Sequence, residues 1–134
     1  MSDSARQLIQ KFFQAIGQGN PLDELITGEM RAWTVSSGET DRQRFLGGVK
    51  LLGAIIGGSL RYDIDALTVQ EDRAVAEVTS RGTLPDGAPF TNVHAFIFRI
   101  CDGRIASVAE FMNQWVVEEK IAPLIQKASA ARES

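Results

Sequence analysis

The stretch EDRAVAEVTSRGTLPDGAPFTNVHAFIFRICDGRIASVAEFMN, residues 71–113, alternates between apolar and polar side chains and is interrupted by short turn signals. Such alternation is typical of β-strands that bury one face. The segments PDG at 85–87 and CDG at 101–103 have the composition of tight turns. With the residues just upstream, the pattern predicts an antiparallel meander of four strands, over residues 60–70, 73–84, 90–100 and 104–115.

Apolar residues upstream of these strands recur at helical spacing. Residues 4–17 carry one apolar stripe that includes Phe12, and residues 41–56 carry another that includes Leu52. The remaining expected elements are a short helix from Asn20-Pro21 to about Gly28, a short strand over residues 30–35 and a last helix over residues 117–131. This order predicts a single α+β domain over residues 1–134, with helices packed on one face of a curved antiparallel sheet.

Composition restricts the class of partner. Of the 134 residues, 44% are hydrophobic and 23% are charged, and the net charge is −3, so no basic surface for nucleic acid is expected. The longest apolar run, residues 51–60, is too short to cross a membrane. The start of the chain has no signal-peptide pattern, and the lone Cys101 forms no disulfide within the chain, so a cytoplasmic location is expected. One histidine with scattered acids has no metal-ligand spacing, so neither a metal nor another cofactor is expected.

The segments DRAVAE, PDG, NVHAFIF and DGRI in residues 71–113, and the order of elements over nearly the whole chain, resemble one known family. It comprises the SnoaL-like, ketosteroid-isomerase-related proteins of the nuclear-transport-factor-2-like superfamily, which are cone-shaped α+β barrels. Enzymes of several classes and non-catalytic binding modules share this fold, so the resemblance implies a fold and leaves the activity open. It also implies a homodimer through the convex sheet face, where we expect an apolar patch of Val93, Ala95, Ile97, Ala76 and Val78.

Ketosteroid isomerase chemistry is not expected, because the family's catalytic positions are not kept. Phe12 stands where the resemblance places a catalytic tyrosine, and phenylalanine has no hydroxyl. Ser36 or Ser37 stands where an aspartate base is expected, and Val93 where an acidic hydrogen-bond donor is expected.

The only histidine, His94, lies on a strand face, and the resemblance implies that the faces carrying His94, Arg81 and Glu110 line the cone. We therefore predict His94 and Glu110 as an acid/base pair and Arg81 as an electrostatic clamp. The predicted pocket lining consists of Phe12, Trp33, Leu52, Thr79, Asn92, Phe96 and Met112.

Two functions follow from an apolar pocket with a few polar groups, which is the usual form of a small-molecule site. The first is a cofactor-independent isomerase, lyase or hydrolase that moves a proton on a mostly apolar small molecule, or adds or removes water. The second is a non-catalytic small-molecule-binding or accessory module, with His94 a satisfied core residue. A hydrogen bond between His94 and Glu110 beside an open cavity would favour the first, and a cavity filled by Phe96 and Met112 the second.

Overall fold

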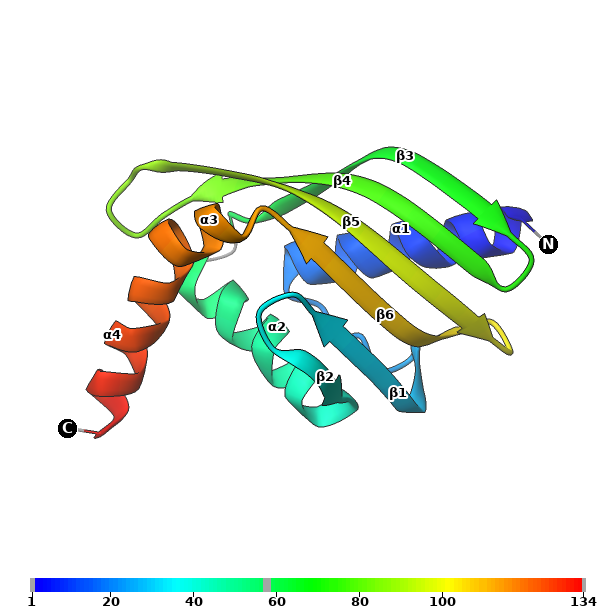
Figure 1. Ribbon diagram of the computed structural model, residues 1–134, viewed down its shortest axis with the longest axis horizontal. Helices are drawn as coiled ribbons and strands as arrows, with labels where there is room; N and C mark the ends of the chain where they lie inside the picture. The colour runs from blue at the N-terminus through cyan, green and yellow to red at the C-terminus, as the bar shows by residue number, and fades with distance from the viewer. Residues whose placement is uncertain (1, 57–58, 134) are drawn as a thin grey trace.

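The structure, a computed structural model, describes residues 2–56 and 59–133. Six strands form one curved sheet that does not close, in the order β2-β1-β6-β5-β4-β3, so the predicted α+β class is confirmed (Figure 1). The elements in chain order are α1 (Ser2–Gln18), β1 (Ile26–Thr34), β2 (Gly38–Asp41), α2 (Arg42–Ile56), β3 (Arg61–Gln70), β4 (Arg73–Thr83), β5 (Pro89–Cys101), β6 (Arg104–Met112), α3 (Gln114–Val116), the π-helical turn η1 (Val117–Ile121) and α4 (Ala122–Glu133).

The predicted meander is present, since β3, β4, β5 and β6 pair in sequence as antiparallel neighbours. The sheet is wider than predicted, because β1 pairs in parallel with β6 and β2 pairs with β1. The short helix predicted from Asn20 to Gly28 is wrong, because β1 already begins at Ile26. Ile26 is buried, and Ile105 donates its N–H to Leu25 at 2.8 Å. Pairing with β6 and burial of Ile26 therefore override the local helix signals.

Helices α1 and α2 lie on one side of the sheet, which curves over them, while α4 extends away from the body (Figure 1). The core between helix and sheet is aromatic. Phe12 is fully buried, and its ring meets Phe13 and Phe98 edge-on at centroid distances of 5.2 and 5.3 Å. This packing buries the helix-facing side of the sheet, which we call the inner face.

The strand β4 presents the opposite face from the one predicted. Register partners in an antiparallel pair lie on the same face, and Val78 and Ser80 pair with His94 and Asn92 on β5. Ala76, Val78 and Ser80 are accordingly buried on the inner face. Two residues of the predicted dimer patch, Ala76 and Val78, are therefore on the wrong side of the sheet.

Candidate functional site

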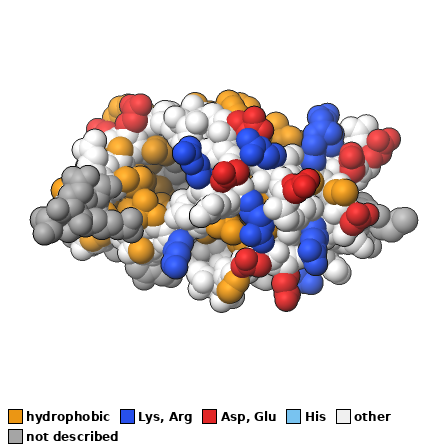
Figure 2. All heavy atoms as spheres, turned by 90° about the horizontal axis from the view of Figure 1, so that it is seen from below, with side chains coloured by type: hydrophobic (Ala, Val, Ile, Leu, Met, Phe, Trp, Pro, Cys, Tyr) orange, Lys and Arg blue, Asp and Glu red, His pale blue; other side chains and the backbone are white. Residues whose placement is uncertain are grey.

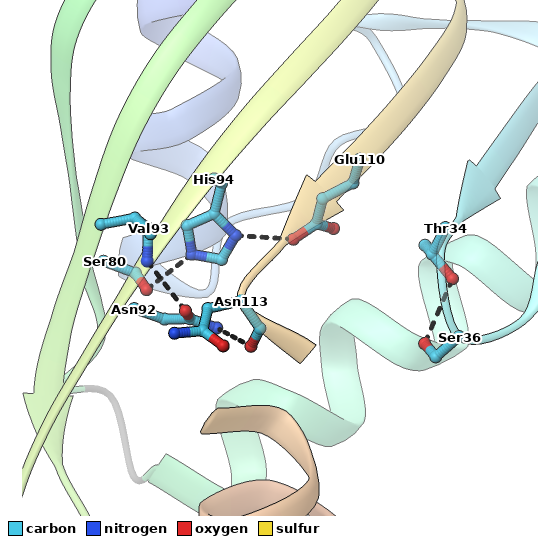
Figure 3. A network of polar contacts seen from close by, with 8 residues as sticks. All are labelled: Thr34, Ser36, Ser80, Asn92, Val93, His94, Glu110 and Asn113. Atoms are coloured by element: carbon cyan, nitrogen blue, oxygen red, sulfur yellow. Dashed lines mark hydrogen bonds and ion pairs between the residues drawn. The ribbon is translucent and has the colours of Figure 1, made fainter. Parts of the chain in front are cut away.

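Three polar side chains lie in a diagonal row across neighbouring strands of the inner face. His94 on β5 is opposite Val78 on β4 and Met112 on β6. Ser80 is two residues beyond the first partner, and Glu110 is two residues before the second, so one lies on each side of His94 (Figure 3). Side chains at such diagonal positions are within reach of one another.

Both ring nitrogens of His94 have a polar partner. His94 Nδ1 is 2.8 Å from Oε2 of Glu110, and His94 Nε2 is 2.7 Å from Oγ of Ser80 (Figure 3). A carboxylate accepts hydrogen bonds only, so Nδ1 carries the proton that it donates to Glu110. In neutral histidine Nε2 is then the acceptor, and the Ser80 hydroxyl donates to it. Side-chain exposure is 6% for His94 and 23% for Glu110, so water competes weakly for these bonds.

A pocket of about 250 Å³ lies between the inner face and the helices. His94, Glu110 and Ser80 line it, together with mainly apolar side chains from α1, α2, the strands and η1. The face shown in Figure 2 has a hollow beside a group of hydrophobic side chains. A concave, mostly apolar site with a few polar groups is the usual form of a small-molecule site.

Polar groups also line a second part of this pocket, around the end of β1. Thr34 Oγ1 is 3.4 Å from Ser36 Oγ and accepts the N–H of Ser37 at 3.0 Å. Thr34, Ser37 and Arg44 all line the pocket. The lining therefore has two polar regions, one on β4 to β6 and one on β1 and α2.

Tyr62 on β3 is the register partner of Ser80 and lines the same pocket. Burial raises the pKa of the Tyr62 hydroxyl well above its ordinary value, and the negative charge of Glu110 raises it further. Its ring centroid is 5.9 Å from that of His94. Tyr62 thus keeps its proton over the physiological pH range and can donate a hydrogen bond.

Residues 9–108 match the SnoaL-like domain family. The chain belongs to this family. No curated protein matches it. Among solved structures, it is similar to TsrD from Streptomyces laurentii, with 24% identity, a TM-score of 0.75 and coverage of 90% of this chain and 96% of that chain.

Two further solved structures are similar to this SnoaL-like chain. Wild-type IdmH from Streptomyces antibioticus, a proposed polyketide cyclase, is 18% identical with a TM-score of 0.77, covering 87% of this chain and 96% of that chain. An NTF2-like protein from Anabaena variabilis is 19% identical with a TM-score of 0.73, covering 83% of this chain and 87% of that chain. At these identities the likeness shows the fold alone.

Most of the residues predicted for the site of this SnoaL-like protein do meet in one place. His94 and Glu110 are hydrogen-bonded partners at the pocket. The predicted lining residues found there are Phe12, Leu52, Asn92, Phe96 and Met112.

Arg81, Thr79 and Trp33 do not lie where they were predicted. Arg81 pairs with Asp63, and Thr79 donates to Asp65 at 2.6 Å. Trp33 packs on Phe111 at a centroid distance of 5.0 Å and is 37% exposed. All three lie outside the pocket lining. Alternation explains all three positions. Thr79 and Arg81 are the chain neighbours of the inward-facing Ser80, and Trp33 lies between Ala32 and Thr34, which line the pocket.

Sequence reasoning missed Ser80 and Tyr62. The signal that could have found Ser80 is the β4–β5 register: Thr83 pairs with Pro89 across the PDG turn, which places Ser80 opposite Asn92. Tyr62 is harder to place, because β3 has a register shift between Ile64 and Ala66. Such an irregularity exchanges the two faces partway along a strand.

No group of three or more His, Cys, Asp or Glu within residues 2–56 and 59–133 could hold a metal ion. In the same part of the chain, no helix is long and apolar enough to cross a membrane.

Proposed function

We propose that this SnoaL-like protein binds a mostly apolar small molecule in the pocket and transfers a proton on it through His94. The observation that carries the proposal is the position of His94, which is bonded to Glu110 at the lining of a mostly apolar pocket. A base of this kind serves isomerisation or the addition and removal of water without a cofactor. The fold supports a small-molecule-binding domain.

Glu110 orients His94 for this role. Its hydrogen bond to Nδ1 holds the tautomer in which Nε2 carries a lone pair and can accept a proton. The Ser80 hydroxyl is hydrogen-bonded to Nε2 at 2.7 Å. Rotation about the single side-chain torsion of Ser80 would break this bond and leave Nε2 available to a substrate. Arg81 pairs with Asp63 outside the pocket and has no part in this step.

Proton transfer can be tested before the natural substrate is known. Apolar ketones small enough for the pocket are incubated with the protein in D₂O, and NMR follows the loss of hydrogens next to the carbonyl. We expect His94→Gln to slow the protein-dependent exchange by about a hundredfold or more, the usual contribution of a general base. Arg81→Gln is the matched control outside the pocket. Exchange that is equal in both variants and wild type would rule out His94 as the base.

A non-catalytic binding module is the second candidate, and one observation favours it. Both ring nitrogens of His94 already have partners, as expected of a histidine that is satisfied within a core. The NMR exchange assay separates the two candidates. A ketone that shifts the His94 ring resonances without exchanging its hydrogens would support the binding module.

We also propose a homodimer through the outer sheet face, with a patch different from the predicted one. Val93, Ala95 and Ile97 remain on this face, while Val75, Trp33 and Phe111 replace Ala76 and Val78. Val93 is 56% exposed and Phe111 is 42% exposed. A contiguous apolar surface of this kind is typical of protein interfaces. The positions of these residues on neighbouring strands of the outer face support pairing of two copies.

A further inference from the structure

Ser80 is an unusual residue on the inner face. Its neighbours along the face of β4 are the apolar Ala76 and Val78, yet Ser80 is a polar residue with only 1% exposure. The one side-chain partner that the structure describes for its hydroxyl is His94 Nε2, at 2.7 Å. Ser80 is among the residues that line the pocket, so a molecule bound there would lie against this otherwise buried residue.

Ser80, His94 and Glu110 form a continuous hydrogen-bonded chain. Its two bonds measure 2.7 Å from Ser80 Oγ to His94 Nε2 and 2.8 Å from His94 Nδ1 to Glu110 Oε2. A hydroxyl, an imidazole and a carboxylate joined in this order are the nucleophile, base and orienting acid of acyl-transfer enzymes. That arrangement is defined by geometry, and it occurs on unrelated folds.

We propose that Ser80 is a nucleophile that accepts an acyl group from small apolar esters or thioesters. Ser80 Oγ forms a bond to the carbonyl carbon while its proton passes to His94 Nε2. The bond from carbon to the leaving oxygen or sulfur then breaks, and His94 gives that proton to the leaving group. Water, deprotonated by His94, then bonds to the acyl carbon, the bond from that carbon to Ser80 Oγ breaks, and His94 returns the proton to Oγ. An ester and water thus become an acid and an alcohol, and a thioester and water become an acid and a thiol.

Two hydrogen-bond donors flank Ser80 on neighbouring strands. Tyr62 on β3 and Asn92 on β5 are its register partners, and both line the pocket. The Asn92 amide nitrogen makes only a long bond of 3.4 Å, to the Asn113 carbonyl. Within residues 2–56 and 59–133, no hydrogen bond of the Tyr62 hydroxyl is found. The backbone N–H groups around Ser80 belong to the sheet ladder, so we assign the stabilisation of an oxyanion to the side chains of Tyr62 and Asn92, which lie on the strands beside Ser80.

The substrate class follows from the pocket. A volume of about 250 Å³ with a mainly apolar lining suits a short aliphatic or aromatic acyl group. This inference rests on the pocket and on the His94 base of the proposed function, but it assigns a different bond-making atom, Ser80 Oγ.

Phenylmethanesulfonyl fluoride is a suitable probe, because it has a compact apolar ring and sulfonylates activated serines. Ser80 Oγ would bond to sulfur as fluoride leaves, with the proton passing through His94 to solvent. We expect intact-mass spectrometry to show one added phenylmethanesulfonyl group per chain, and fragmentation of the wild-type adduct to place it on Ser80. This assignment needs no variant. A group found on another residue, or no addition, would overturn the proposal.

Variants test the roles of the three residues. Ser80→Ala should abolish labelling, whereas Ser107→Ala, a serine on the outer face of β6, should leave it unchanged. His94→Gln should slow labelling by at least about a hundredfold. Glu110→Gln should slow it by at least about tenfold, because an amide can donate to Nδ1 and favour the tautomer in which Nε2 no longer accepts. Equal rates in wild type and His94→Gln would overturn the proposal.

Ketone exchange, measured on the same samples, distinguishes this inference from the proposed function. If ketone exchange depends on His94 but Ser80 is not labelled, the proposed function stands and the proposal that Ser80 is a nucleophile is overturned. If Ser80 is labelled in a reaction that depends on His94, and no ketone exchange is seen, the nucleophilic role of Ser80 is supported and the proposed proton transfer on ketones is rejected.

Discussion

Replacing Glu110 with glutamine should lower the free energy of unfolding by about 1 kcal/mol at neutral pH. Glutamine has nearly the same volume and can still hydrogen-bond to His94 Nδ1, through either its amide oxygen or its amide nitrogen, so the change replaces a charged hydrogen bond with a neutral one. Hydrogen bonds to charged groups contribute about 1.5–3 kcal/mol, and neutral ones about 1 kcal/mol. Burial of the carboxylate opposes this gain, but Glu110 is 23% exposed and keeps part of its hydration. The loss of the charged hydrogen bond should therefore slightly outweigh the relief from burying a carboxylate, so the net effect of the substitution is destabilising.

Urea denaturation measures this loss. For denaturant slopes of about 1–3 kcal/mol per molar, a loss of about 1 kcal/mol lowers the midpoint by about 0.3–1 M. Glu77→Gln on the outer face of β4 is the matched control, because its register partners are Ala66 and Ala95. An exposed glutamate without a charged partner opposite should change the midpoint very little.

A double-mutant cycle with His94→Gln shows whether the effect passes through the histidine. In the His94→Gln background, Glu110→Gln should cost much less, giving a coupling energy above about 0.5 kcal/mol. Two results would refute the reasoning: equal midpoints for Glu110→Gln and Glu77→Gln, or additive effects of the two pocket substitutions.

Three further predictions concern other parts of the molecule. Tyr62, the only tyrosine, should remain protonated well above its ordinary pKa of about 10, so absorbance at about 295 nm should rise only at higher pH, and Glu110→Gln should lower that pKa. The unfolded chain loses the Tyr62 proton at lower pH than the folded chain, so the free energy of unfolding should fall by about 1.4 kcal/mol per pH unit above about pH 10. A urea midpoint that does not change with pH there would contradict the burial of Tyr62. Gly82→Ala should destabilise the fold by about 1–3 kcal/mol, because an added Cβ would come within 3.0 Å of an Ile56 methyl. Gly28→Ala is the control, since a Cβ there meets no atom within 4 Å, and equal urea midpoints for the two variants would disprove the predicted clash. Light scattering should give a dimer at micromolar concentration and a monomer for Val93→Glu, and a wild-type monomer would remove the proposed interface.

The pairing of His94 with Glu110 was predicted only with the family resemblance, which implied that both strand faces line the cone, but strand periodicity and turn composition were enough to predict the meander and the α+β class. These features depend on short-range physics. A PDG or CDG turn joins its two strands locally, and alternation along β5 and β6 assigns each residue to a face. The Phe12 stripe of α1 likewise follows from helical spacing alone.

Only the tertiary structure decided which face of β4 looks inward and what β1 pairs with. Alternation identifies two faces but does not say which one is buried, and a shift of one residue in register exchanges them. The pairing of Ser80 with Asn92 settled that choice, removing Arg81 from the pocket and bringing Ser80 to His94. The parallel pairing of β1 with β6 joins segments far apart in the chain, and no local pattern contains that information. Register and long-range pairing are set by how the whole sheet buries its inner face against α1 and α2, so the complete row of Ser80, His94 and Glu110 exists only in the folded protein.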